Sequence, residues 1–185
     1  MVAALVTTSP PMSVRPITKN FGFSAAHDAI DPVRLAEANI NPATRLATDY
    51  LNHFNEAIMM LELAPQMPDC IADLAAWRPL SYCEHFAASN FKERELAIVA
   101  YQAADPARRG RLEELSMIMN AVLVATIGVM RQSPDSALGP LSEEALFGLR
   151  PLLARAGALI NGVEAPVERG EADSTQAAVD ALFER

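Results

Sequence analysis

The beginnings of several helices are marked in this sequence by a capping residue followed by proline. Asp and Asn accept hydrogen bonds from the free backbone N–H groups of a first helical turn, and proline suits the first helical position because no donor is needed there. Ser81 and Glu84 add the spacing of a capping box. Sustained alternation of apolar and polar residues is missing from the sequence, so these signals predict an all-α protein. The capping pairs are Asp31-Pro32, Asn41-Pro42 and Asp105-Pro106.

The same signals, together with the prolines and glycines between them, divide the chain into predicted helices. A cluster of serine, proline and glycine predicts a loop over residues 133–140. Pro151 predicts a break or kink in the helix after that loop, because proline removes a backbone donor from a helix interior. The predicted helices cover residues 32–39, 43–63, 69–77, 82–88, 92–104, 106–132, 143–161 and 175–184.

The segment from Met117 to Met130 is the most apolar part of the sequence and contains no charged residue. It is shorter than the roughly 20 apolar residues that span a bilayer, so we predict a helix that is buried on all sides at the centre of a bundle. Short loops favour antiparallel neighbours. The predicted fold is therefore an all-α, irregular helical bundle of about 6–8 helices, with two long central helices at 43–63 and 106–132.

The two ends of the chain differ in pattern from its middle. Residues 1–24 show no apolar period and contain three prolines, which predicts an irregular segment. Residues 25–162 form the predicted bundle domain, and residues 163–185 predict a linker followed by a short amphipathic helix. The apolar stripe of that helix is a candidate docking surface for the bundle itself or for another protein. It consists of Val179, Leu182 and Phe183.

Charge and cysteine content restrict the classes of partner. The chain of 185 residues has a formal net charge of -8, which disfavours binding to nucleic acid and to anionic membranes. The apolar run from Met1 to Val6 has no basic residue before it, unlike a secretory signal. We therefore expect a soluble, cytoplasmic protein in which Cys70 and Cys83 stay reduced.

A metal site is one alternative function that the sequence offers. Imidazole and carboxylate ligands suit zinc, iron or manganese, and helical bundles build such sites from side chains on facing helices. The order Glu-x-x-His that di-iron bundles use is absent from the sequence, so a structural role for the histidines is preferred. The candidate metal ligands are His53, Glu56, Glu84, His85 and His27.

Other catalytic patterns are incomplete. Ser81, Cys83 and His85 are close in sequence, but residues two apart on a helix do not face each other. The sequence contains no Gly-x-Ser-x-Gly, no Cys-x-x-Cys and no glycine-rich phosphate loop. A phosphorelay role for His53 is disfavoured because the acidic surface near Glu56 would repel a phosphoryl group.

These observations favour a non-enzymatic protein that acts through protein interaction or regulation. Met117, Met119 and Met130 lie on the most apolar helix, and methionine adapts to irregular partners as well as to core gaps. A small-ligand sensor with an apolar pocket between helices is the second alternative. We expect no cofactor apart from the divalent metal of the first alternative.

Overall fold

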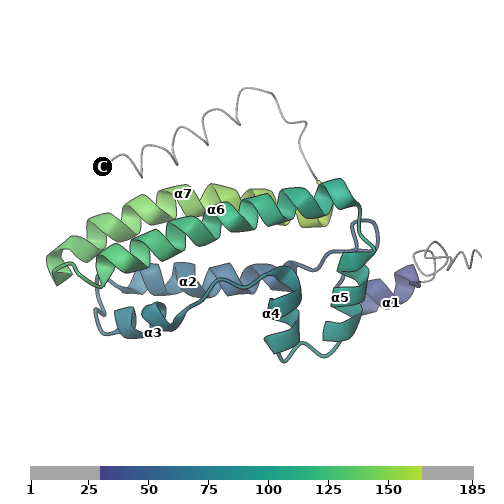
Figure 1. Ribbon diagram of the computed structural model, residues 1–185, viewed down its shortest axis with the longest axis horizontal. Coiled ribbons are helices and arrows are strands. Elements are labelled where there is room, and N and C mark those ends of the chain that lie inside the picture. The colour runs from purple at the N-terminus through teal and green to yellow at the C-terminus, as the bar shows by residue number, and fades with distance from the viewer. Residues whose placement is uncertain (1–29, 164–185) are drawn as a thin grey trace, which may run out of the picture.

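The computed structural model describes residues 30–163, and helices are the regular elements of this range (Figure 1). The seven α-helices and one 3-10 helix found there confirm the predicted all-α bundle. The predicted segment 1–24, His27 and the predicted helix 175–184 with its apolar stripe lie outside the described residues. The elements are α1 (Pro32–Glu37), η1 (Thr48–Leu51), α2 (Asn52–Leu63), α3 (Cys70–Ala76), α4 (Tyr82–Ala88), α5 (Arg94–Gln102), α6 (Pro106–Met130) and α7 (Asp135–Asn161).

The two longest helices form one side of the molecule. α6 and α7 lie side by side and run antiparallel (Figure 1). The shorter helices α2 to α5 all lie on one side of this pair (Figure 1). A turn at residues 131–134 joins the two helices at one end. At the other end, Arg108 Nη1 donates a hydrogen bond to the carbonyl oxygen of Leu159 over 2.8 Å. Met119 and Leu149 are fully buried, so both long helices contribute to the core.

Helix capping agrees with the sequence at the starts of α6 and α4. The Asp105 carboxylate accepts a hydrogen bond from the backbone N–H of Arg108 over 2.8 Å. The Glu84 carboxylate accepts one from the backbone N–H of Ser81 over 2.8 Å, and the Ser81 hydroxyl accepts one from the N–H of Glu84 over 3.3 Å. These caps satisfy donors that a helix cannot satisfy internally.

The predicted start of a helix at residue 43 is wrong. The Asn41 side chain does accept a hydrogen bond from the N–H of Ala43, but the chain then turns, with Arg45 at φ 61. The Thr44 hydroxyl donates to the carbonyl oxygen of Ile160 over 2.6 Å, which ties this turn to the end of α7. The cap therefore closes a local turn, and helical structure begins only at Thr48.

The predicted loop at 133–140 and the predicted break at Pro151 are also wrong. α7 begins at Asp135 and continues through Pro140 and Pro151 as one helix of 27 residues. Both prolines are exposed, so the backbone carbonyl that each leaves without an intrahelical donor can be reached by water. The two long central helices are therefore α6 and α7, and the prediction that placed one of them at 43–63 is wrong.

α6 is not buried on all sides, contrary to the prediction. Of the 18 most apolar consecutive residues in this 25-residue helix, 33% are buried. By length and composition alone, the complete helix is long and apolar enough to cross a membrane. The prediction rested on the shorter segment Met117–Met130 alone, which is not long enough. In the structure it packs against α7 and α3.

Candidate functional site

Aromatic side chains from three elements form a cluster beside α6. The Tyr50 ring lies 5.1 Å from the Tyr82 ring, and the Tyr82 ring stacks on the Tyr101 ring at 4.4 Å between centroids. These residues come from η1, α4 and α5. Tyr50 and Tyr82 are buried, so the cluster holds α4 and α5 against η1, which leads directly into α2.

The tyrosine hydroxyls have fixed partners. Tyr82 accepts a hydrogen bond from the backbone N–H of Ala47 over 2.8 Å, and Tyr50 donates to the carbonyl oxygen of Leu80 over 3.0 Å. Tyr101 donates to a carboxylate oxygen of Glu113. Burial raises the pKa of Tyr82, and burial together with the Glu113 carboxylate raises the pKa of Tyr101. Both phenols therefore stay protonated near neutral pH.

A crevice with a volume of about 510 Å³ lies beside this cluster, between the segment 79–84 and α6. Its lining includes the carboxylates of Glu84 and Glu113 and contains no lysine, arginine or histidine. We refer to it as the tyrosine crevice. It is lined by Tyr50, Pro79, Leu80, Ser81, Tyr82, Cys83, Glu84, Tyr101, Leu112, Glu113, Ser116, Met117 and Asn120.

One buried polar atom in the crevice has no protein partner. The Ser116 hydroxyl donates to the carbonyl oxygen of Leu112 over 2.7 Å, but Asn120 Oδ1 accepts no hydrogen bond from the described residues. A buried acceptor without a donor destabilises the folded state unless another group supplies the donor. The sequence did not predict this crevice; the polar Asn120 within the apolar 117–130 segment could have served as a signal for it, whereas the three tyrosines, far apart in sequence, gave none.

Two of the predicted metal ligands meet in the structure. The His53 ring stacks on the Trp77 indole at 4.8 Å, and the His85 ring lies 5.9 Å from the His53 ring. Burial is the main cause that lowers the pKa of both histidines, and the neighbouring His85 lowers that of His53 further. His53 Nε2 is buried without a hydrogen-bond partner among the described residues.

The other predicted ligands do not join this pair. Glu56 is exposed on α2, and the Glu84 carboxylate belongs to the capping box of α4. His27 lies outside the described residues. Within residues 30–163, no group of three or more His, Cys, Asp or Glu side chains is placed to hold a metal ion. The described part of the chain therefore does not assemble the predicted metal site.

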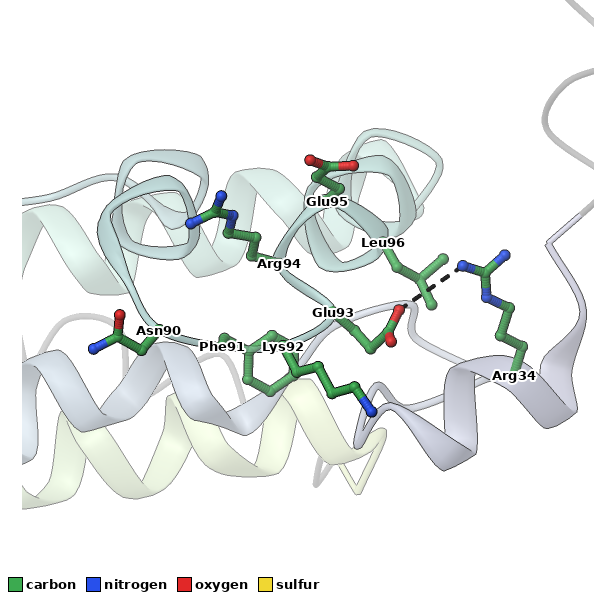
Figure 2. A pocket seen from close by; sticks show the side chains of 8 residues that line it. All are labelled: Arg34, Asn90, Phe91, Lys92, Glu93, Arg94, Glu95 and Leu96. Atoms are coloured by element: carbon green, nitrogen blue, oxygen red, sulfur yellow. Dashed lines mark ion pairs between the residues drawn. The ribbon is translucent and has the colours of Figure 1, made fainter.

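A second hollow, of about 440 Å³, is lined by charged side chains around the start of α5. Arg34 of α1 and Glu93 form an ion pair across it, with 3.8 Å between Nη2 and Oε2. Figure 2 shows the charged ends of Lys92, Arg94 and Glu95 pointing in different directions, away from any common point. An arrangement of this kind suits solvation of the individual charges better than recognition of one ligand.

The remaining unusual surface is uncharged. Val124 of α6 is 52% exposed and Phe147 of α7 is 84% exposed. Both lie on helix faces that point away from the core; the neighbours of Val124 on α6 carry no charge, whereas the exposed Glu143, Glu144 and Arg150 border Phe147 on α7. We call this surface the outer face. Its members are Met117, Ala121, Val124, Ala125, Gly128, Phe147, Pro151 and Ala154.

Comparison with known proteins identifies no relative. No protein-family model matches the chain, and neither the curated proteins nor the solved structures contain a significant match. A function is therefore inferred from the geometry of the tyrosine crevice and of the outer face.

Proposed function

We propose that this protein is a self-associating interaction module, in which the outer face binds the outer face of a second copy. The observation behind this proposal is the exposed, uncharged surface of α6 between Met117 and Val129. A helix that is apolar all round is normally covered all round, yet the described residues bury only part of this one. Contiguous exposed apolar surface is typical of sites that bind another protein.

The side of the molecule formed by α6 and α7, which carries the outer face, is large enough for the interface of a specific dimer. α6 and α7 contain 25 and 27 residues, which makes each about 37–40 Å long at the usual rise per residue. Two adjacent helices present a surface about 20 Å wide. The whole two-helix surface is therefore on the order of 700–800 Å², and a stable complex buries about 800 Å² on each partner.

The spacing of the outer residues on α6 suits pairing with another helix. Met117, Ala121, Val124 and Gly128 are separated by four, three and four residues, which is the alternation of a coiled-coil seam. Two such seams related by a twofold axis make a closed dimer, because each copy offers the same surface. The small side chains at two of the four positions allow a close approach of the second helix.

A second copy covers this surface more completely than the chain's own C-terminal stripe would. If the segment 175–184 is helical as the sequence predicts, the stripe of Val179, Leu182 and Phe183 extends over about one and a half turns. The uncharged part of α6, residues 117–129, extends over more than three turns. The absence of charge on the outer face also gives a strongly basic or acidic partner no electrostatic advantage.

Sedimentation velocity of the full chain at increasing concentration tests the proposal. We expect the wild type to show a concentration-dependent dimer. Val124→Glu should abolish it, because two carboxylates would be buried without partners in the interface. The matched control is Val33→Glu on α1, where the valine is 63% exposed but lies outside the outer face. This variant should dimerise like the wild type.

Three results would contradict a dimer through the outer face. A wild type that is monomeric at every concentration would exclude the second copy as the occupant. Dimerisation only after Leu182→Ala and Phe183→Ala would show that the C-terminal stripe covers the surface instead. Flotation of the monomer with phosphatidylcholine vesicles, lost in Val124→Glu, would identify a lipid surface as the occupant.

A further inference from the structure

The tyrosine crevice has the chemistry of a binding site that self-association does not explain. We propose that it binds a small organic cation, an amine attached to an apolar or aromatic body. The inference is independent of the proposed dimer, since only Met117 belongs to both the crevice and the outer face. The tyrosine crevice lies between helices, which is where bundle proteins often bind small molecules.

Two side chains of the crevice offer acceptors for hydrogen bonds from a ligand. Three hydroxyl donors of the lining already have acceptors within the chain, namely those of Tyr50, Tyr101 and Ser116. Asn120 Oδ1 accepts no hydrogen bond from the described residues, and the Glu113 carboxylate can accept more than the single bond from Tyr101. An ammonium group supplies three donors, which suit acceptors of this kind.

The charge of the lining favours a cation. Glu84 and Glu113 are its carboxylates, and it contains no basic side chain. Arg109 does not belong to the lining, but its guanidinium carbon lies 5.7 Å from the centroid of the Tyr101 ring, and its positive charge acts on the Cys83 thiol. With a net charge of -8 on the whole chain, the surrounding field also attracts positive ligands.

The remaining surface of the crevice suits an apolar body. The rings of Tyr50, Tyr82 and Tyr101 lie within 4.4–5.1 Å of their neighbours in the cluster. Aromatic faces attract cations and pack against aromatic ligands. Leu80 and Leu112 complete the apolar part of the lining. The volume of about 510 Å³ lies within the range of roughly 300–1,000 Å³ that is usual for small-molecule sites.

Titration of the ¹⁵N-labelled full chain with 2-phenylethylamine, followed by amide chemical shifts, tests the inference. We expect saturable shifts at residues of the crevice, among them Cys83 and Ser116. Two probes of similar size separate charge from shape, because 3-phenylpropanoate carries the opposite charge and 2-phenylethanol carries none. The anion should cause no saturable shift, and the alcohol should bind more weakly than the amine.

Variants locate the binding group. Glu113→Gln retains an oxygen that accepts the Tyr101 hydrogen bond, so the fold should persist while the affinity for the amine falls about tenfold. Asn120→Ala is a second variant, and its affinity for the amine should also fall. Glu114→Gln, one residue along α6 and outside the lining, is the matched control and should bind like the wild type.

Each other outcome overturns the inference. No saturable shift with the amine would show that the crevice does not bind this class of ligand. Equal shifts with the amine and with 3-phenylpropanoate would show that charge plays no part in recognition. An unchanged affinity in both Glu113→Gln and Asn120→Ala, with the fold intact by circular dichroism, would place the bound amine outside the tyrosine crevice.

Discussion

His53 shows how burial of one titratable residue affects the stability of the whole chain. The residue is 7% exposed, and its imidazole stacks on Trp77 beside His85. Its pKa in the folded state is lowered, mainly by burial, so the unfolded chain binds more protons as the pH falls below about 6.5. The free energy of unfolding should therefore be highest above that pH and decrease below it. Urea denaturation at pH values on either side of about 6.5 measures this difference.

The variant His53→Phe isolates the contribution of this side chain. Phenylalanine retains a flat ring against Trp77 but does not titrate, so the loss of stability on acidification should become smaller than in the wild type. A residual loss is expected from His85, because burial lowers its pKa as well, against the opposing effect of Asp49. An identical pH dependence in the variant and in the wild type would show that His53 is protonated equally in both states.

The sequence did not predict the tyrosine crevice, although one of its residues is anomalous in its surroundings. Asn120 interrupts an apolar run, and such a residue needs a partner when it is buried. The meeting of His53 with His85 could be proposed but not established, because the two lie on α2 and α4 and their approach depends on tertiary packing. The same holds for Tyr50 and Tyr101, whose positions carry no local signal.

At the scale of helices, local chemistry predicted starts better than ends or continuity. The caps at Asp105 and Ser81 formed as expected, because each capping side chain and its backbone donor are only three residues apart in the sequence. Pro140 and Pro151 were expected to end or bend a helix, but packing of α7 against α6 and α2 outweighs the lost hydrogen bonds. Whether a helix continues past a proline depends on tertiary contacts, and these cannot be predicted from a single sequence.

The glycine at position 128 of α6 provides a test at this scale. A Cβ atom added at Gly128 would meet no atom of the described chain within 4 Å, so Gly128→Ala should stabilise the monomer by about 0.5–1 kcal/mol through helix propensity. The added methyl group should at the same time weaken the proposed dimer, because it separates the two α6 helices. Thermal denaturation of dilute protein and sedimentation velocity measure the two effects.

Gly139→Ala on α7 is the matched control for this test. Gly139 also has open space around an added Cβ, but it does not belong to the outer face. It should raise the stability of the monomer without weakening the dimer. If both glycine variants dimerised as the wild type does, α6 of the second copy would not approach Gly128 closely, and another part of the outer face would have to form the interface.

For the molecule as a whole, two surfaces of different chemistry adjoin on the same helix. The tyrosine crevice contains acceptors and carboxylates, and the part of the outer face on α6 has no charged residue. They meet at Met117, because Glu113, Ser116 and Asn120 of α6 line the crevice, while Ala121 and Val124 are exposed on the outer face. The composition of this helix was visible in the sequence, but which of its sides remains uncovered was not, since that depends on the positions of α7 and α3.

Salt dependence distinguishes an apolar dimer from one held by ion pairs. Each copy carries a net charge of -8, so two copies repel each other, and raising the salt concentration from about 0.1 M to 1 M shortens the screening length from about 10 Å to 3 Å. Association through the uncharged outer face should therefore become stronger in high salt, as measured by sedimentation velocity. Val124→Glu should remain monomeric at both salt concentrations. A dimer that dissociates as salt is added would instead be held by charged residues, and the outer face would not be its interface.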